Sequence, residues 1–162
     1  MVILGIDPGF AIIGYGIIEK DKDIKVVDYG VVTTPKEDGI AKRLETSYNA
    51  IKVLIEKFNP DVIAIEELFY FKNQTTVIPV AEARGVILLA CNQSKKPIYE
   101  YTPLQIKQAL TGNGRAEKKQ VQYMVTNILG LASIPKPDDA ADALAVAITH
   151  SQTNNLLVNN RV

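Results

Sequence analysis

The 162-residue chain is 47% apolar and 22% charged, which is typical of one compact globular domain and excludes collagen-like, coiled-coil and low-complexity proteins. Its one cysteine excludes an internal disulfide framework, and its apolar runs are too short to span a bilayer, so we expect a cytoplasmic protein with no membrane partner. The 18 Lys and Arg residues balance the 18 Asp and Glu residues, and this zero net charge by itself argues against a nucleic-acid partner.

Apolar periodicity along the chain predicts an alternation of strands and helices. The strands are expected at residues 1–7, 12–20, 24–33, 62–67 and 98–101. The helices are expected at residues 44–58, 75–92, 103–110, 117–129 and 138–150. This order predicts an α/β fold, with a five-stranded mixed sheet flanked by helices on both faces, in a single domain of residues 1–150. The polar residues 151–162 are expected to form a frayed tail.

Two local signals refine this prediction. Gly14 and Gly16 interrupt the second strand, which indicates a close backbone approach or a bulge. Thr102 and Pro103 form a favourable helix start, with a capping side chain followed by proline at the first helical position.

Acidic residues occur where a soluble fold would favour apolar side chains. Asp7 ends the first apolar strand, and Glu66 lies at the end of another. Burying a carboxylate costs several kcal/mol unless the group is paired, protonated or metal-bound. Asp139 and Asp142 are three residues apart and share one face of the last helix, where no Lys or Arg follows before its end. Asp138 fits the spacing to Asp142 as well, although a first-turn acid is commonly explained by the helix dipole.

If these acids converge, they bring a charge of about −4 into a partly dry site. Two divalent cations would neutralise that charge, and oxygen ligands select Mg²⁺ or Mn²⁺. The only histidine, His150, is expected to interact with the helix dipole at the end of its helix rather than to act in catalysis. Two metals held by carboxylates are suited to in-line hydrolysis of a phosphodiester.

Several motifs together resemble the RuvC family of crossover-junction (Holliday junction) endodeoxyribonucleases, which have an RNase H-like fold. The matching segments follow one another across residues 1–150 and are Gly5-Ile-Asp-Pro-Gly9, Gly14-Tyr-Gly16, Ala64-Ile-Glu-Glu67 with Phe69, Ala83-Arg-Gly85 and Asp139-Ala-Ala-Asp-Ala-Leu-Ala145. The resemblance implies that the catalytic, metal-binding acids are Asp7, Glu66, Asp139 and Asp142. The Asp-Ala-Ala-Asp spacing favours Asp139 over Asp138.

The resemblance also implies an activity and its partners. It implies a Mg²⁺-dependent enzyme with two metal ions per active site, Mn²⁺ being a substitute, that resolves four-way junction DNA by paired symmetric nicks near the crossover. The expected products carry a 5′ phosphate and a 3′ hydroxyl. A homodimer is implied, which would place two sites symmetrically on the two equivalent strands. Association with a RuvA-RuvB branch-migration complex is implied by the family alone.

Candidate DNA-binding residues lie outside the acidic cluster. Phe69 matches the family's junction-contacting aromatic residue, and a base stacked on it would contribute about 1–3 kcal/mol. Residues 84–120 carry seven cations and two anions, a net charge of +5 that the overall neutrality conceals. Within this segment, Lys107 and Lys118 coincide with basic DNA-contacting positions of the family. Arg115 and Lys119 are added on the basis of their charge.

Other functions are compatible with parts of the same pattern. Another RNase H-like nuclease, acting on RNA, is the main alternative. The first glycine-rich turn also resembles a phosphate loop of the actin-like ATPases, but those enzymes need two domains to enclose a nucleotide. A junction-binding module without catalysis would have no reason to bury four acids.

Overall fold

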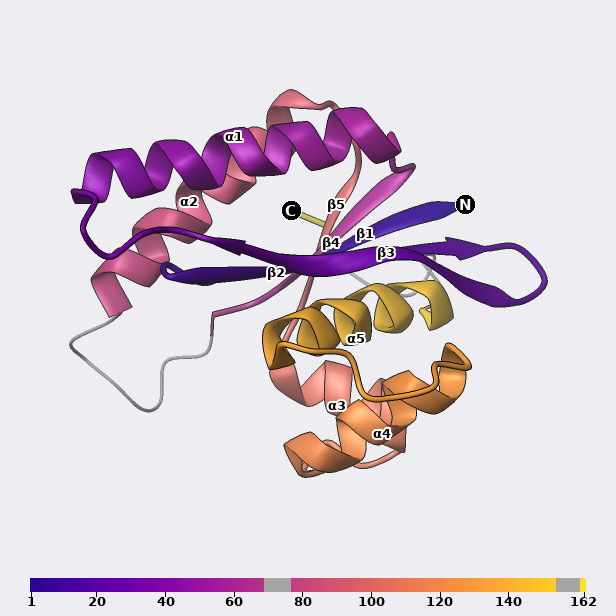
Figure 1. The fold of residues 1–162 in the computed structure, drawn as a ribbon. Coiled ribbons are helices and arrows are strands. Elements are labelled where there is room, and N and C mark those ends of the chain that lie inside the picture. The colour runs from indigo at the N-terminus through magenta and orange to yellow at the C-terminus, as the bar shows by residue number, and fades with distance from the viewer. Residues whose placement is uncertain (69–76, 154–160) are drawn as a thin grey trace.

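The computed structural model describes residues 1–68, 77–153 and 161–162, and places a central sheet between two layers of helices (Figure 1). Within these residues the sheet has five strands in the order β3-β2-β1-β4-β5. The strands are β1 (Val2–Asp7), β2 (Ile12–Lys20), β3 (Ile24–Thr33), β4 (Val62–Glu66) and β5 (Ile98–Tyr101). The β1-β2 and β2-β3 pairs are antiparallel, whereas β1-β4 and β4-β5 are parallel. The predicted mixed α/β sheet is confirmed.

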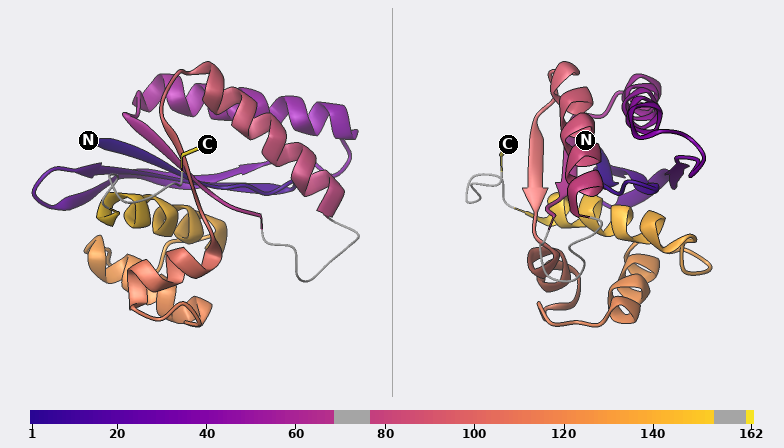
Figure 2. Two further views of the ribbon diagram at one scale, coloured as in Figure 1. Left: turned by 180° about the vertical axis from the view of Figure 1, so that it is seen from behind. Right: turned by 90° about the vertical axis from the view of Figure 1, so that its left-hand side faces the viewer.

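The helices of the described segments cover both faces of this sheet. They are α1 (Ile40–Phe58), α2 (Val77–Gln93), α3 (Pro103–Thr111), α4 (Lys118–Ile128) and α5 (Asp138–Gln152). Helices α1 and α2 pack together on one face, and α5 lies directly on the other (Figures 1 and 2). Helices α3 and α4 pack on α5 from outside, forming a further layer. None of the described helices combines the length and the apolar character that a membrane span requires.

The middle strands are apolar because both of their faces are covered. In β1, Ile3, Leu4 and Ile6 are fully buried: Ile3 packs in the core beneath α5, while Leu4 and Ile6 pack in the core beneath α1 and α2. The sequence of a strand that is buried on both faces is a continuous hydrophobic run, whereas a strand with one exposed face alternates between apolar and polar residues. A charged residue at the end of such a run, as in β1 and β4, therefore marks the place where the chain leaves the core.

Helix α5 approaches the sheet closely because glycines face it. A Cβ atom on Gly14 would lie 2.0 Å from the carbonyl oxygen of Asp139, and one on Gly5 would lie 2.2 Å from that of Ala143. At Gly16 the nearest atoms belong to Leu144, from 2.8 Å. The predicted close approach at Gly14 and Gly16 is thus confirmed, while the irregular register of β2 falls later, between Ile17 and Ile18.

Helix α3 starts where the sequence predicts. Thr102 is its N-cap, with Pro103 at the first helical position. The backbone N–H of Gln105 donates to Thr102 Oγ1 at 3.2 Å, and the Thr102 N–H donates to Gln105 Oε1 at 2.8 Å. This reciprocal capping satisfies two N–H groups that the helix itself cannot satisfy.

The end of the chain returns to the sheet. Helix α5 extends two residues beyond the predicted His150, to Gln152. Arg161 forms an antiparallel bridge with Tyr99, and the Val162 N–H donates to the Ile98 carbonyl oxygen at 3.0 Å. These two residues of the predicted tail are therefore hydrogen-bonded to β5, because an edge strand has backbone groups open to pairing.

His150 is buried at the end of its helix. It is 1% exposed, its Nδ1 lies 2.8 Å from the Tyr101 hydroxyl, and its ring centroid lies 4.7 Å from that of Tyr99. Burial lowers the pKa of the imidazole. His150 does lie in the last turn of α5, as expected, and the structure adds that this turn is buried and places the ring beside Tyr99 and Tyr101 of β5.

Candidate active site

The sheet register brings Asp7 and Glu66 to the same edge of the sheet. They are the last residues of β1 and β4, which are parallel neighbours with Ile6 opposite Ile65. Because the carboxyl ends of adjacent parallel strands meet at one edge, both carboxylates emerge there.

The start of α5 reaches the same edge through Gly14. Gly14 pairs with Asp7 in the β1-β2 ladder, and the missing side chain of Gly14 leaves room for the backbone of Asp139. Asp142 follows three residues later, on the same side of the helix. The structure therefore brings together the four acids that the sequence predicts for the site.

Burial and neighbouring acids raise the pKa values of Asp7, Glu66 and Asp142. Burial, followed by the negative charges of Glu66, Asp142 and Asp139, holds the pKa of Asp7 well above its usual value. Burial and the charge of Asp142 raise the pKa of Glu66 to about 7, against the opposing effects of Lys118, a contact with Asp7, and Lys107. Burial also raises the pKa of Asp142. The nearby lysines therefore do not fully neutralise the negative charge of the four acids.

The chemistry of this cluster fits hard divalent cations. Carboxylate oxygens are the preferred ligands of Mg²⁺ and Mn²⁺, and the shared negative charge attracts such an ion. Within the described ranges, no group of three or more Asp, Glu, His or Cys side chains is arranged so that it could hold a metal ion. Instead, the Nζ atom of Lys118 lies 2.7 Å from Asp142 Oδ2 and supplies positive charge.

Asp138 and Asp139 have different surroundings. Asp138 is paired with Lys136 at 2.7 Å and with Lys118 at 3.8 Å. The hydrogen bond from Lys136 is the main reason why the pKa of Asp138 is lowered. Asp139, in contrast, contributes to raising the pKa of Asp7. This difference supports the preference for Asp139 as the fourth acid.

The turn that follows Asp7 is held by Arg43, which sequence reasoning missed. The Arg43 guanidinium carbon lies 3.7 Å from the centroid of the Phe10 ring, and its Nε donates to Thr34 Oγ1 at 2.9 Å. Thr34 Oγ1 in turn donates to the Phe10 carbonyl oxygen at 2.7 Å. The three residues come from separate parts of the chain, so no local motif could have revealed this network. It fixes the exit of the chain from β1.

The predicted DNA-binding residues fall into separate places. Lys107 and Lys118 line a cavity of about 220 Å³ beside Glu66 and Asp142, whose remaining walls are Pro103, Ile106, Val121 and Ala145. Arg115 and Lys119 are exposed, and neither lines this cavity. Phe69 lies outside the described residues.

A cluster of carboxylates at the edge of a five-stranded mixed sheet, flanked by lysines, is typical of nucleases of the RNase H-like class. The family model described as "Crossover junction endodeoxyribonuclease RuvC" matches residues 3–150, and the chain belongs to this family. The resemblance found in the sequence motifs is thereby confirmed. Nucleases of this family are metal-dependent.

Individual relatives agree with this membership. The crossover junction endodeoxyribonuclease RuvC of Clostridioides difficile is 57% identical over 157 residues, covering 96% of this chain and 93% of the relative. The structure of Thermus thermophilus RuvC superposes with a TM-score of 0.90 at 33% identity, covering 100% of both chains. A second structure, T. thermophilus RuvC in complex with Holliday junction substrate, has a TM-score of 0.89 at 30% identity and the same coverage.

Proposed function

We propose that this protein is a structure-selective DNA endonuclease that resolves Holliday junctions by paired symmetric nicks near the crossover. The observation that carries the proposal is the convergence of Asp7, Glu66, Asp139 and Asp142 at one sheet edge, in a chain of the RuvC family. The likeness over the full chain to a RuvC structure that holds a Holliday junction supports the same substrate.

The four acids would hold two Mg²⁺ ions, or Mn²⁺ in their place. Bound in this way, the metals would activate a water molecule and stabilise the leaving 3′ oxygen, so that the products carry a 5′ phosphate and a 3′ hydroxyl. Asp7 and Glu66 must be ionised to serve as ligands, and both pKa values are raised. Because the pKa of Glu66 is about 7, metal binding would release protons from this group near neutral pH.

The two lysines beside the acids would orient the DNA. Lys118 already contacts Asp142 and lines the same cavity as Lys107. An ammonium group at this position neutralises charge on a scissile phosphate without moving far. Arg115, Lys119 and Phe69 remain candidate DNA contacts, and Phe69 lies beyond what the structure describes.

The proposed homodimer would use α2. This helix buries Ala83, Ile87, Ala90 and Cys91 against its own chain, yet it also exposes Ile78 and Leu89. A helix that is apolar on its outer side as well as its inner side is normally covered by another surface. A two-fold dimer would present two active sites to the two equivalent strands of a junction. A RuvA-RuvB branch-migration partner and a cytoplasmic location remain expectations from the family and the composition.

A cleavage assay with labelled DNA tests the proposal directly. The substrates are a four-way junction, a duplex of matching sequence and an RNA–DNA hybrid, each with Mg²⁺ and with a chelator. We expect Mg²⁺-dependent paired nicks in the junction, closed again by DNA ligase because the ends carry a 5′ phosphate and a 3′ hydroxyl. Preferential cleavage of the hybrid would favour the alternative nuclease acting on RNA, and junction cleavage in the chelator would exclude the metal mechanism.

A further inference from the structure

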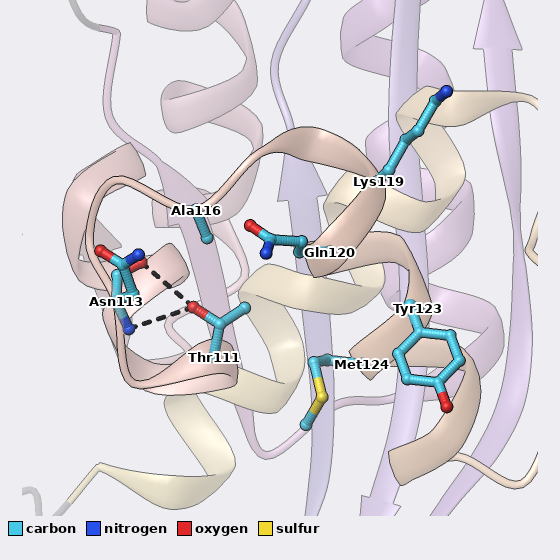
Figure 3. Close-up of a pocket in the computed structure, with 7 residues that line it drawn as sticks. All are labelled: Thr111, Asn113, Ala116, Lys119, Gln120, Tyr123 and Met124. Atoms are coloured by element: carbon cyan, nitrogen blue, oxygen red, sulfur yellow. Dashed lines mark hydrogen bonds between the residues drawn. The ribbon is translucent and has the colours of Figure 1, made fainter.

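A second hollow lies between the loop that follows α3 and the first turns of α4, and Lys119 is the one residue of its lining that the proposed function already uses. It has a volume of about 510 Å³, within the range of small-ligand sites. We call it the α4 groove; it is lined by Thr111, Asn113, Ala116, Lys119, Gln120, Tyr123 and Met124 (Figure 3). These lining residues include one cation and no acid.

One wall of the α4 groove is a loop held by its own hydrogen bonds. Thr111 Oγ1 accepts from the Asn113 N–H at 3.1 Å, and its single hydrogen is shared between the carbonyl oxygens of Lys107 at 2.8 Å and Asn113 at 3.1 Å (Figure 3). The Gly114 N–H donates to Gln108 Oε1 at 3.0 Å, and Gly112 has a φ of 73°, which glycine adopts without strain. This wall is therefore formed before any ligand arrives.

The other wall is the first two turns of α4. Lys119 and Tyr123 are four residues apart and so lie one turn above the other on the same side of the helix. Tyr123 is 62% exposed, so a face of its ring is open to a ligand. Gln120 points toward the loop in Figure 3, and its Oε1 accepts the Glu117 N–H at 2.8 Å, which fixes the amide. The α4 wall thus carries an exposed aromatic ring and an oriented amide, while the Lys119 side chain points away from both (Figure 3).

The α4 groove and the cavity beside the acids share no lining residue, but both are lined by residues of α4. Lys118, the first residue of α4, reaches Asp142, while the next residue lines the groove. A DNA strand whose phosphate lies beside Lys118 would therefore pass Lys119 within a nucleotide or two. Arg115 adds a further exposed positive charge on the adjoining loop.

We propose that the α4 groove binds one unpaired nucleotide of the strand that passes the active site, with the base stacked on Tyr123 and a phosphate beside Lys119. The inference rests on the proposed function, since it requires DNA at the acidic site. A stacked base needs an exposed face, which a nucleotide near a crossover offers and a paired duplex base does not. The concave shape favours a single nucleotide over a flat duplex surface, and the positive charge of Lys119 attracts its phosphate.

Binding measurements with the full chain test the inference. Asp7→Asn serves as the parent, so that DNA stays uncut, and fluorescence anisotropy follows a 12-nucleotide oligothymidylate, a four-way junction and a duplex. Tyr123→Ala should weaken oligothymidylate binding about 5- to 150-fold, the range of one lost base–aromatic stack, and leave duplex binding unchanged. Tyr123→Phe should bind like the parent because it keeps the ring.

Two lysine variants complete the design. Lys119→Gln should weaken binding and reduce the slope of log K against log salt by about 0.7 for the single strand. Lys52→Gln, on α1 at the opposite face of the sheet, should change neither quantity. Thermal unfolding of each variant shows that the fold is intact.

Three outcomes would overturn the groove assignment: unchanged oligothymidylate binding by Tyr123→Ala, an equal loss with Tyr123→Phe, or an equal loss on the duplex. If the parent itself fails to bind the junction, the proposed function fails together with this inference. If the parent binds and Tyr123→Ala is unaffected, the groove assignment alone fails.

Discussion

The ammonium nitrogen of Lys118 lies 2.7 Å from Oδ2 of Asp142, although 24 residues separate the two in the sequence. Lys118 begins α4, and Asp142 lies in the second turn of α5. The pair places one positive charge among acids that otherwise repel one another, and it stands where metal and DNA are proposed to meet.

Replacing Lys118 by Met should separate its effect on metal binding from its effect on cleavage. Loss of a nearby cation should tighten Mn²⁺ binding to the free protein by about tenfold, a modest effect because the half-exposed ammonium is screened by solvent. Cleavage should fall by roughly 100-fold, because the scissile phosphate loses a charge partner. Calorimetry and single-turnover cleavage measure the two, with Lys119→Met as the control for metal binding. Weaker Mn²⁺ binding by Lys118→Met would contradict this account.

Asp7→Asn should abolish cleavage and retain junction binding. The amide keeps the shape of the carboxylate but removes a charged ligand from the centre of the acidic cluster. The metal-free variant should also be more stable than the wild type, because a neutral amide avoids the cost of burying a carboxylate and, beyond that, the repulsion from Glu66, Asp142 and Asp139. Undiminished cleavage in Mg²⁺ would exclude Asp7 from the site.

The stability of the metal-free protein should fall as pH rises from about 4.5 to about 7. Over this range Glu66 ionises in the unfolded chain but keeps its proton in the folded one. The free energy of unfolding therefore falls by on the order of 2–3 kcal/mol. Saturating Mg²⁺ should offset the loss, and more strongly at higher pH, because it binds the ionised carboxylates.

Urea unfolding at pH 5 and pH 8, in chelator and in Mg²⁺, measures this dependence. Glu66→Gln is the reference, since it lacks the titrating group and retains buried His150, whose lowered pKa acts in the opposite direction below about pH 6.5. Equal pH slopes for wild type and Glu66→Gln would contradict the prediction.

Gly14→Ala should damage both stability and activity. Its methyl group would lie 2.0 Å from the Asp139 carbonyl oxygen, so α5 would have to move away from β2. We expect a loss of about 1–3 kcal/mol or more in unfolding free energy, together with reduced cleavage as the acids separate. Gly39→Ala is the matched control, because nothing lies within 4 Å of its added methyl group and its φ of −65° suits alanine.

Leu89→Glu should convert the proposed dimer to a monomer. Leu89 is 51% exposed on α2, and a carboxylate buried in an apolar interface would cost several kcal/mol. Val27→Glu, on β3 and also 51% exposed, tests whether a new surface charge has this effect elsewhere. Light scattering after size-exclusion chromatography gives the mass of each variant. A dimeric Leu89→Glu, or a monomeric wild type, would exclude this interface.

Much of the fold is encoded locally and was predicted from the sequence. The strands at 12–20, 24–33 and 98–101 have the predicted bounds, because apolar runs bounded by turn residues depend on near neighbours. Asp7 and Glu66 could be predicted as site residues for a related local reason. Burying a carboxylate at the end of an apolar strand costs free energy, so an acid in that position indicates a function.

Tertiary packing decided what these local patterns left open. The choice of Asp139 over Asp138 is supported by which acid faces Asp7 and which faces Lys136. The cation that balances Asp142 is absent from α5 itself and comes from α4, and His150 is buried beneath β5. Helical and strand periods report which face of an element is apolar, but they carry no information about which distant element will cover that face. Only the packed structure brings such partners together.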